Sequence, residues 1–218
     1  NLSAAEGKYS IKLNKDIVTK ALGKGIKKVE FVSEIGRAAV TLDSMMDLQQ
    51  LKTIELNATE ALITQQEFDS LTPAQKEIVK PNSKVLEFKA NVAITMGLVI
   101  EVNDFIMPIV IHIPYELKAG ETGDIITVFY LGDDGTVSNM SARYDEEEKE
   151  LIFNTTRLGR FAVKNNIVTF NDVKEGHWGK KWIEAMASKG IVNGKSKDIF
   201  DPEGKVTRAE FAKMITMT

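Results

Sequence analysis

Residues 170–218 read FNDVKEGHWGKKWIEAMASKGIVNGKSKDIFDPEGKVTRAEFAKMITMT, and this stretch decides how the rest of the chain is interpreted. Thr207 is followed three residues later by Glu210, which is the spacing of a capping box at a helix start. Upstream, Trp178 and Trp182 stand four residues apart within HWGKKWIEAMASKG, at helical spacing. The stretch therefore predicts two short helices joined by a long structured loop. We expect the two tryptophans to pack in its core, with stacking on sugar rings as the alternative.

The same stretch carries many residue types at fixed spacings. They are Phe170-x-Asp172-Val173, His177-Trp178, Ile183, Gly190-Ile191-Val192-Asn193-Gly194, Phe200-x-Pro202 and Val206-Thr207-Arg208-Ala209-Glu210-Phe211. Together they resemble the surface-layer homology (SLH) repeat of bacterial envelope proteins. The resemblance implies a non-covalent anchor on secondary cell-wall polysaccharide, often one that bears pyruvate ketals. It also implies tandem repeats with ligand grooves between neighbours, and we expect residues 166–218 to be one repeat of such a set.

Arg208 is the strongest candidate for ligand binding. It takes the first position of the second helix, where free amides and the positive end of the helix dipole favour an anion. Its guanidinium can hold a carboxylate with two hydrogen bonds, and a pyruvyl ketal offers a carboxylate. The alternative is a surface arginine that pairs with Asp201 or Glu203.

Three further residues of the resemblance are ligand-binding candidates, each with a structural alternative. Glu210 can orient the ligand, although helix capping is its first role. Gly194 is expected to adopt positive φ in a turn, with close approach of a ligand to its backbone as the second interpretation. Asp172 can accept hydrogen bonds from ligand hydroxyls or cap a local turn. Gly190 is expected to end the first helix.

The upstream part, residues 1–165, predicts a strand-rich domain with short helices. Helices are expected after Asn14, Ser44, Thr64 and Thr72, because each of these residues can cap a helix N-terminus. Strands are expected over residues 9–13, 28–33, 37–42, 53–57, 85–95, 106–114, 126–131, 136–143, 150–154 and 160–164. Asp134-Gly135 indicates a type I′ hairpin turn. Closely spaced strands with turn signals are typical of a sandwich or barrel-like sheet.

A second and less specific resemblance lies in this upstream part. It is carried by Ile113-Pro114-Tyr115-x-Leu117-x-x-Gly120-Glu121, Val128-x-Tyr130, Asp134-Gly135 and Tyr144-Asp145. These residues are similar to the β-rich module that often precedes SLH repeats. The module commonly ends in Thr-His-Phe-Ser, where this chain has Thr156-Arg157-Leu158-Gly159.

Composition removes several classes of function. The chain has 218 residues, a net charge of −3 and no cysteine, so disulfides, zinc–thiolate sites and thiol nucleophiles are excluded. The net charge gives no reason to expect nucleic acid as a partner. No run of 18 apolar residues predicts a transmembrane segment, and no signal peptide is seen, so an exported chain would be a fragment or a mature form.

Motifs for catalysis are also missing from the sequence. There is no nucleophile elbow, phosphate loop or dinucleotide fingerprint, so no catalytic residue and no cofactor are predicted. His112 and His177 lack partners at metal-ligand spacing, and structural roles are favoured for both. The acidic cluster over residues 145–150 indicates a solvated hairpin tip rather than a metal site.

The sequence thus predicts an α+β protein. Residues 1–165 form a strand-rich spacer or assembly domain, and residues 166–218 form a small helical SLH unit. The predicted function is non-enzymatic anchoring of an exported S-layer or envelope protein at the bacterial cell surface. Its expected partners are wall polysaccharide, neighbouring SLH repeats and S-layer subunits. The alternative is a fragment of an exported carbohydrate-active enzyme with an SLH anchor, which a pocket holding two close carboxylates would favour.

Overall fold

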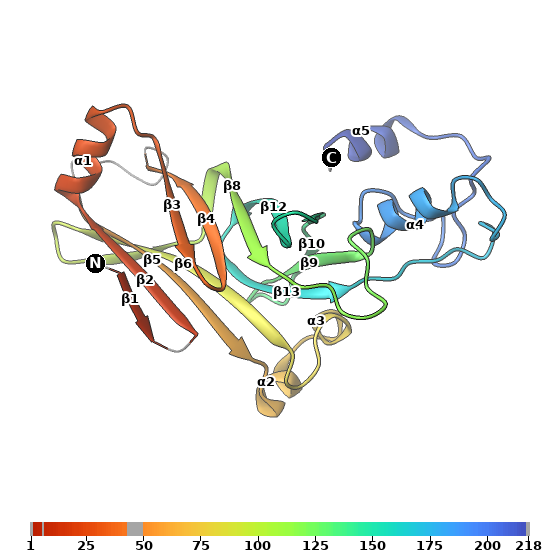
Figure 1. Ribbon diagram of the computed structural model, residues 1–218, viewed down its shortest axis with the longest axis horizontal. Helices are drawn as coiled ribbons and strands as arrows, with labels where there is room; N and C mark the ends of the chain where they lie inside the picture. Colours follow the sequence, from red (N-terminus) through yellow and green to blue (C-terminus); the bar gives the residue numbers. More distant parts are fainter. Residues whose placement is uncertain (1, 6, 43–49, 217–218) are drawn as a thin grey trace.

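The computed structural model describes residues 2–5, 7–42 and 50–216, and Figure 1 shows their arrangement. The first strands and helices are β1 (Leu2–Ala5), β2 (Lys8–Asn14), α1 (Lys15–Gly23), β3 (Lys28–Ser33), β4 (Gly36–Thr41), β5 (Leu51–Leu62), α2 (Gln65–Ser70), α3 (Pro73–Ile78) and β6 (Lys84–Ile94). They are followed by β7 (Val99–Val102), β8 (Asp104–Pro114), β9 (Ile126–Leu131), β10 (Val137–Asn139), β11 (Arg143–Asp145), β12 (Glu150–Arg157), β13 (Gly159–Asn165), α4 (Lys180–Ser188) and α5 (Arg208–Thr216). The strand-rich α+β class expected for the upstream part is confirmed.

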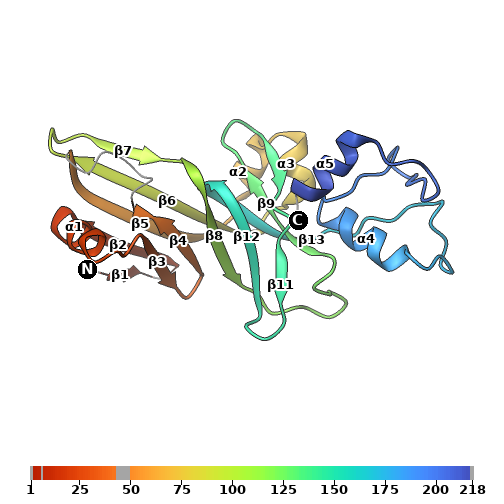
Figure 2. The same ribbon diagram turned by 90° about the horizontal axis from the view of Figure 1, so that it is seen from above.

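The strands form two antiparallel sheets stacked as a sandwich (Figure 2). The larger sheet has the order β1-β2-β5-β6-β13-β9-β10, and β7 adds to one edge of β6. The smaller sheet has the order β11-β12-β8-β4-β3. β13 lies in the middle of the larger sheet, paired with β6 on one side and with β9 on the other. This strand leads directly into the C-terminal segment, residues 166–218.

The core of the sandwich is made by alternate residues of strands from both sheets. Phe161 of β13 contacts Phe153 of β12 across the two layers, with ring centroids 5.1 Å apart. It also meets Phe88 of the neighbouring strand β6 at 6.2 Å, edge to face. All three rings are at most 3% exposed. Aromatic pairs of this geometry add to the stabilisation that comes from burying their surface.

The short helices begin where their capping residues predict. Asn14 accepts a hydrogen bond from Ile17 N at 2.9 Å at the start of α1. Thr64 caps α2, and Thr72 forms a full capping box with Gln75 at the start of α3. α2 and α3 cover the outer face of the larger sheet, over a second apolar cluster made by Ile63, Val79, Val85, Leu131 and Ala162. The helix predicted from Ser44 falls on residues 43–49, outside the described part of the chain.

Some upstream details differ from the sequence-based expectation. β1, β7 and β11, each of three or four residues, do not correspond to separately predicted strands. The type I′ turn predicted at Asp134-Gly135 is wrong in type. Such a turn needs positive φ at both central residues, and only Gly135 has it, at +85°. Instead, the carboxylate of Asp134 accepts hydrogen bonds from the backbone N–H and the hydroxyl of Thr136.

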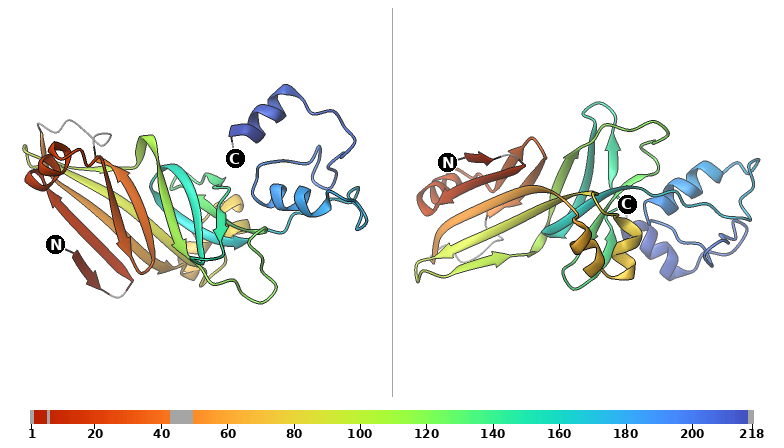
Figure 3. Two further views of the ribbon diagram at one scale, coloured as in Figure 1. Left: turned by 45° about the horizontal axis from the view of Figure 1, so that its top comes forward. Right: turned by 90° about the horizontal axis from the view of Figure 1, so that it is seen from below.

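The C-terminal segment has its own small core. Phe170, Val173 and Ala187 are its buried residues, and Ile183 and Phe200 pack against them. The rings of Phe170 and Phe200 lie 5.2 Å apart, so the start of the segment and its long loop are held together. α4 and α5 lie at one end of the elongated molecule and α1 lies at the other (Figure 3).

The prediction that both tryptophans belong to this core is wrong. Trp178 is 87% exposed and Trp182 is 60% exposed. α4 begins only at Lys180, so Trp178 lies before the helix and its spacing to Trp182 does not define a helix face. The inward face of α4 is made by Ile183 and Ala187 instead.

The C-terminal end of α4 is docked onto the strand-rich region. The carbonyl of Ser188 accepts Asn139 Nδ2 at 2.9 Å and Asn166 Nδ2 at 2.7 Å. The carbonyl of Lys189 accepts Ser141 Oγ at 2.8 Å. The last carbonyls of a helix have no partner within the helix. Here the partners are side chains of Asn139 and Ser141 in the strand-rich region and of Asn166, which follows β13.

The side chain of Lys189 adds two further hydrogen bonds between the end of α4 and the strand-rich region. Its ammonium group donates to the carbonyl of Gly123 at 2.8 Å and to the carbonyl of Ile126. Burial lowers the pKa of Lys189 to about 8, with a smaller opposing effect from Asp124. Gly190 follows with φ of +74°, which confirms it as the residue that ends the helix.

We predict that Phe170→Ala and Trp182→Ala have very different costs. Phe170 is 6% exposed, so its truncation should lower the free energy of unfolding by about 3–5 kcal/mol. Trp182 is largely exposed, and its truncation should cost less than about 1 kcal/mol. Urea unfolding followed by circular dichroism measures both. Equal costs would mean that the core of the C-terminal segment is assigned incorrectly.

We predict that docking of α4 strengthens between pH 8 and about 10.4. In that window the docked Lys189 is neutral while a solvent-exposed lysine still carries its proton, so the undocked state binds more protons and docking gains stability as pH rises. The measurement is the difference in unfolding free energy between the wild type and Lys189→Met. This difference should shift in favour of the wild type across the window. Lys197→Met, at an exposed position, is the control and should show no such trend.

Candidate functional site

A groove of about 340 Å³ lies between the long loop of the C-terminal segment and α5. Phe200, Val192 and Met214 supply apolar lining. Three lysines and two carboxylates supply charge, and the full charged set is Lys195, Lys205, Lys213, Glu210 and Asp201. An apolar surface with converging charged groups is the usual composition of a small-ligand site. Of the four predicted binding residues, Gly194 and Glu210 line this groove, whereas Arg208 and Asp172 are not part of its lining.

Glu210 is held by two different partners. Its Oε2 accepts the backbone N–H of Thr207 at 2.7 Å, and Thr207 Oγ1 accepts the N–H of Glu210 at 3.2 Å. The predicted capping box is therefore confirmed. Its Oε1 accepts Lys195 Nζ at 2.6 Å. The hydrogen bond from Lys195, together with those from Thr207, lowers the pKa of Glu210 to about 2.

Asp172 is used inside the fold. Its carboxylate accepts the backbone N–H of Phe200 at 2.9 Å and of Asp201 at 2.7 Å. The hydrogen bond from Phe200 is the largest cause of its lowered pKa. These bonds tie the first turn of the segment to a loop 28 residues further on. The local turn that sequence reasoning offered as the alternative for Asp172 is thus replaced by a long-range tether.

Gly194 does not have the positive φ that the sequence suggested. It is required for a different reason. A Cβ atom at this position would lie 2.5 Å from the carbonyl oxygen of Ser196 and 2.6 Å from that of Ile199. Such distances are far below van der Waals contact, so only glycine permits this close packing of the backbone at the wall of the groove.

Arg208 begins α5 and its side chain is exposed. The pairing with Asp201 or Glu203 that we considered as its alternative role is not formed within the described residues, where no ion pair involves Arg208. Its side chain is therefore exposed at the start of α5, where the positive end of the helix dipole favours an anion.

The lysines of the groove are the functional candidates that motif reasoning missed. Lys195, Lys205 and Lys213 lie on its wall, although none belongs to a recognisable short motif. One signal was available in the sequence. From Phe170 onward there are nine Lys and Arg against seven Asp and Glu, so the segment is basic while the remainder of the chain is acidic.

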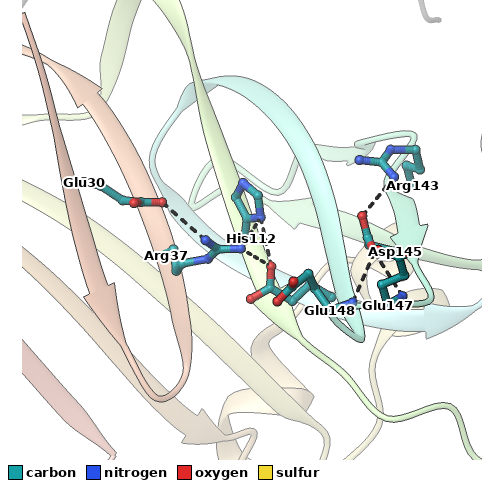
Figure 4. Close-up of polar contacts among 8 residues, drawn as sticks. Glu30, Arg37, His112, Arg143, Asp145, Glu147 and Glu148 are labelled. Carbon is teal, nitrogen blue, oxygen red and sulfur yellow. Dashed lines mark hydrogen bonds and ion pairs between the residues drawn. The ribbon is translucent and has the colours of Figure 1, made fainter.

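The two histidines take part in structural contacts. His112 lies on the smaller sheet within a network that joins Glu30, Arg37 and Glu150 across four strands (Figure 4). Burial of the Glu150 carboxylate opposes ionisation, but hydrogen bonds from Arg37 and His112 outweigh it and hold the pKa of Glu150 below its ordinary value. His177 Nδ1 accepts the N–H of Gly179 at 3.1 Å just before α4.

The acidic turn between β11 and β12 is closed by its own side chain. Asp145 accepts the backbone N–H groups of Glu147 and Glu148 at 3.1 and 3.2 Å (Figure 4). Among the described residues, no group of three or more His, Cys, Asp or Glu side chains is arranged to hold a metal ion.

A second pocket, of about 330 Å³, lies on the strand-rich region and has several carboxylates in its lining. Its acidic lining is Glu87, Glu101, Asp104, Asp133 and Asp134, and its basic lining is Lys89, Arg157 and Arg160. Glu87 pairs with Lys89 at 3.1 Å, and Asp104 pairs with Arg157 at 3.5 Å. These two carboxylates therefore take part in ion pairs with cations of the same pocket.

Comparison with known protein families gives a match in the C-terminal segment. The model of the S-layer homology domain matches residues 169–212. The match contains the groove lining from Ile191 to Glu210, the tethering Asp172 and the exposed Arg208. It covers a minor part of the chain, and the two sheets lie outside it.

Several curated proteins are similar to parts of the chain. An amylopullulanase of Thermoanaerobacterium thermosulfurigenes is 32% identical over 98 residues, which is 45% of this chain and 5% of that protein. An S-layer protein of Bacillus licheniformis is 47% identical over 72 residues, 33% of this chain and 8% of that protein. A cellulosome-anchoring protein of Acetivibrio thermocellus is 32% identical over 59 residues, 27% of this chain and 13% of that protein.

These alignments span only a small part of each relative, between 5% and 13% of its length. The 98 residues of the first alignment are more than residues 169–218 contain, so that similarity reaches upstream of the family match. None of the helices in the described residues is long and apolar enough to cross a membrane. The family model and the S-layer relative point to the same kind of protein, and the residues that the model matches include most of the groove lining. The chain therefore contains an S-layer homology domain, which lies at residues 169–212.

Proposed function

We propose that this chain anchors an exported envelope protein to secondary cell-wall polysaccharide without a covalent bond. Residues 166–218, with α4, the long loop and α5, act as the SLH unit, and residues 1–165 act as a spacer or assembly domain. The observation that carries the proposal is the basic groove with apolar lining, beside a solvent-facing arginine at a helix start. The family match and the printed name of the cellulosome-anchoring relative support attachment at the cell surface.

The chemistry of the groove suits a pyruvylated sugar. A pyruvyl ketal presents one carboxylate and one methyl group on a sugar ring. Lys195, Lys205 and Lys213 offer positive charge to the carboxylate, while Phe200 and Met214 offer apolar surface to the methyl group. Arg208 provides the bidentate hydrogen bonds that fix the orientation of a carboxylate.

The other predicted binding residues act mainly by shaping the groove. Glu210 holds Lys195 at the rim through the 2.6 Å hydrogen bond. Asp172 fixes the loop that carries Phe200. Gly194 keeps the wall narrow, so that a ligand can reach its backbone.

Neighbouring SLH repeats are the proposed partners of the exposed apolar surface. Phe211 and Ile215 of α5 are 59% and 61% exposed, and α5 has no buried residue. Exposed apolar side chains gathered on one helix are typical of an interface. This supports grooves shared between adjacent repeats, on the outer surface of a bacterial cell.

The enzymatic alternative receives less support. The printed name of the amylopullulanase relative describes an enzyme, but the alignment covers 5% of that protein. In the acidic pocket of the strand-rich region, Glu87 and Asp104 are each engaged in an ion pair. We therefore propose that the chain itself is not an enzyme.

We predict that Arg208→Ala weakens binding of purified wall polysaccharide by about 10-fold to 150-fold, because a charge-assisted hydrogen bond contributes about 1.5–3 kcal/mol. Arg208→Lys should recover only part of the loss, since an ammonium cannot form the bidentate fork. Isothermal titration measures the affinities, in a version of the chain that also carries neighbouring repeats. Lys197→Ala makes the same charge change at an exposed position outside the groove, and it should bind almost as well as the wild type.

Two outcomes of this titration would contradict the proposal. Full binding by Arg208→Ala would remove Arg208 from its assigned role. Tight binding by the present chain, without neighbouring repeats, would contradict the shared groove. We expect the present chain to bind weakly, because one charge-assisted pair falls well short of the roughly 8 kcal/mol that micromolar affinity requires.

We predict no hydrolysis of peptidoglycan or wall glycan by residues 1–165. The expected result is the same background release of reducing sugar from the wild type, Glu101→Gln and Asp133→Asn, two carboxylates of the acidic pocket. Turnover that disappears on either substitution would establish the enzymatic alternative instead.

A further inference from the structure

β7 is an edge strand with one free side. Within the described strands it pairs only with β6, through Ala90↔Val102 to Ala93↔Val99. β13 occupies the same edge of β6 further along, from Phe88 to Leu86, so β7 and β13 lie end to end. Figure 2 shows β7 along the outer rim of the molecule. Its outward backbone groups are therefore open to another strand.

The hairpin that contains β7 exposes an unusual amount of apolar surface. Met96 is 81% exposed, Leu98 59%, Val99 66% and Ile100 47%. Val99 and Ile100 are consecutive, so they point to opposite faces of the sheet, and both faces are uncovered there. Contiguous apolar surface of this kind marks a protein–protein contact.

Two other edge strands of the described part carry charged residues that discourage pairing, whereas β1, with the sequence LSAA, carries none. β3 has Lys28 and Glu30, and β11 has Arg143 and Asp145. The last residue of β10, Asn139, is engaged with the carbonyl of Ser188. β7 has the sequence VIEV, without lysine, proline or a bulge. Charged edges discourage strand addition, so the apolar edge of β7 favours it.

The alternation of β7 fits a second copy of itself. Ile100 lies opposite Val92, a residue fully buried in the core, so Ile100 is on the core side of the sheet. Leu98 and Val102 share that side by the period of two. In an antiparallel pair centred on Ile100, the two Ile100 side chains meet, and each Leu98 faces the other copy's Val102. The row of core residues then continues from one copy into the next.

Charge selects the same register. Glu101 is the one charged residue of β7. In the pair centred on Ile100, each Glu101 lies opposite a Val99, and the two carboxylates are kept apart. A shift that centred the pair on Glu101 would place two carboxylates directly opposite each other, which is destabilising. A two-fold pairing of this type is closed and ends at the dimer.

We propose that β7 is a dimerisation strand, which pairs antiparallel with β7 of a second copy about a two-fold axis at Ile100. The larger sheets of the two copies then form one continuous sheet. The contact uses the strand-rich region alone, so it does not depend on glycan binding by the C-terminal segment.

The test uses the absence of cysteine from the chain. Residues that face each other across an antiparallel pair have Cα atoms about 4.5–5.5 Å apart, within the range that a disulfide spans. Ile100→Cys should therefore give a disulfide-linked dimer when treated with diamide, which takes up the two protons and two electrons released by the thiols. Val32→Cys is the matched control, because Val32 is 53% exposed on an edge strand of the other sheet. It should remain monomeric on a denaturing gel.

Light scattering on the intact chain gives an independent measurement. The wild type should show twice the mass of the 24.2 kDa chain. Ile100→Lys should halve that mass, whereas Val32→Lys and Ile215→Lys should leave it unchanged. Circular dichroism establishes that the variants are folded. A monomeric wild type, an open-ended polymer, or loss of the dimer in Ile215→Lys would each overturn the proposal, the last because it would assign the contact to α5.

Discussion

The end of α4 depends on hydrogen bonds that its own helix cannot make. The carbonyls of Ser188 and Lys189 are satisfied by Asn139, Ser141 and Asn166, and the ammonium of Lys189 returns two hydrogen bonds to the strand-rich region. An unpaired carbonyl at a buried helix end lowers the stability of the fold. The end of α4 therefore depends on the side chains that bond to it. These hydrogen bonds attach the end of α4 to the strand-rich region through a few residues. The orientation of the SLH domain is thus set by the edge of the sandwich beside β9 and β10.

The apolar residues of the chain divide into two groups with different roles. Those facing the space between the sheets, such as Phe88, Phe153 and Phe161, are buried and stabilise the fold. Those on α5 and on the β6–β7 hairpin remain in water, although they are as apolar as the first group. The two exposed sets lie at different ends of the molecule (Figure 3). The two proposed contacts, with neighbouring repeats and with another copy, therefore use separate surfaces of the chain.

Local signals predicted much of this structure, and long-range contacts were not predicted. Asn14, Thr72, Thr207 and Gly190 mark helix ends through bonds to residues close in sequence, so their roles were readable. Trp178 was misassigned because α4 begins only at Lys180, so Trp178 does not lie on a face of that helix. Asp172 and Lys189 act on partners 28 or more residues away. The groove lysines come together only when the loop folds onto α5, and no spacing rule connects them.

The position of β13 has a mechanical consequence. A protein held at a surface through its C-terminal end is loaded in tension, and the load enters the sandwich through this strand. β13 is flanked on both sides by antiparallel partners, with six paired residues on β9 and three on β6. Hydrogen bonds between strands run perpendicular to the strand axis, so a pull along β13 shears them together instead of opening them one at a time. The sandwich therefore resists a pull on its C-terminal end in the direction in which β13 is most strongly held.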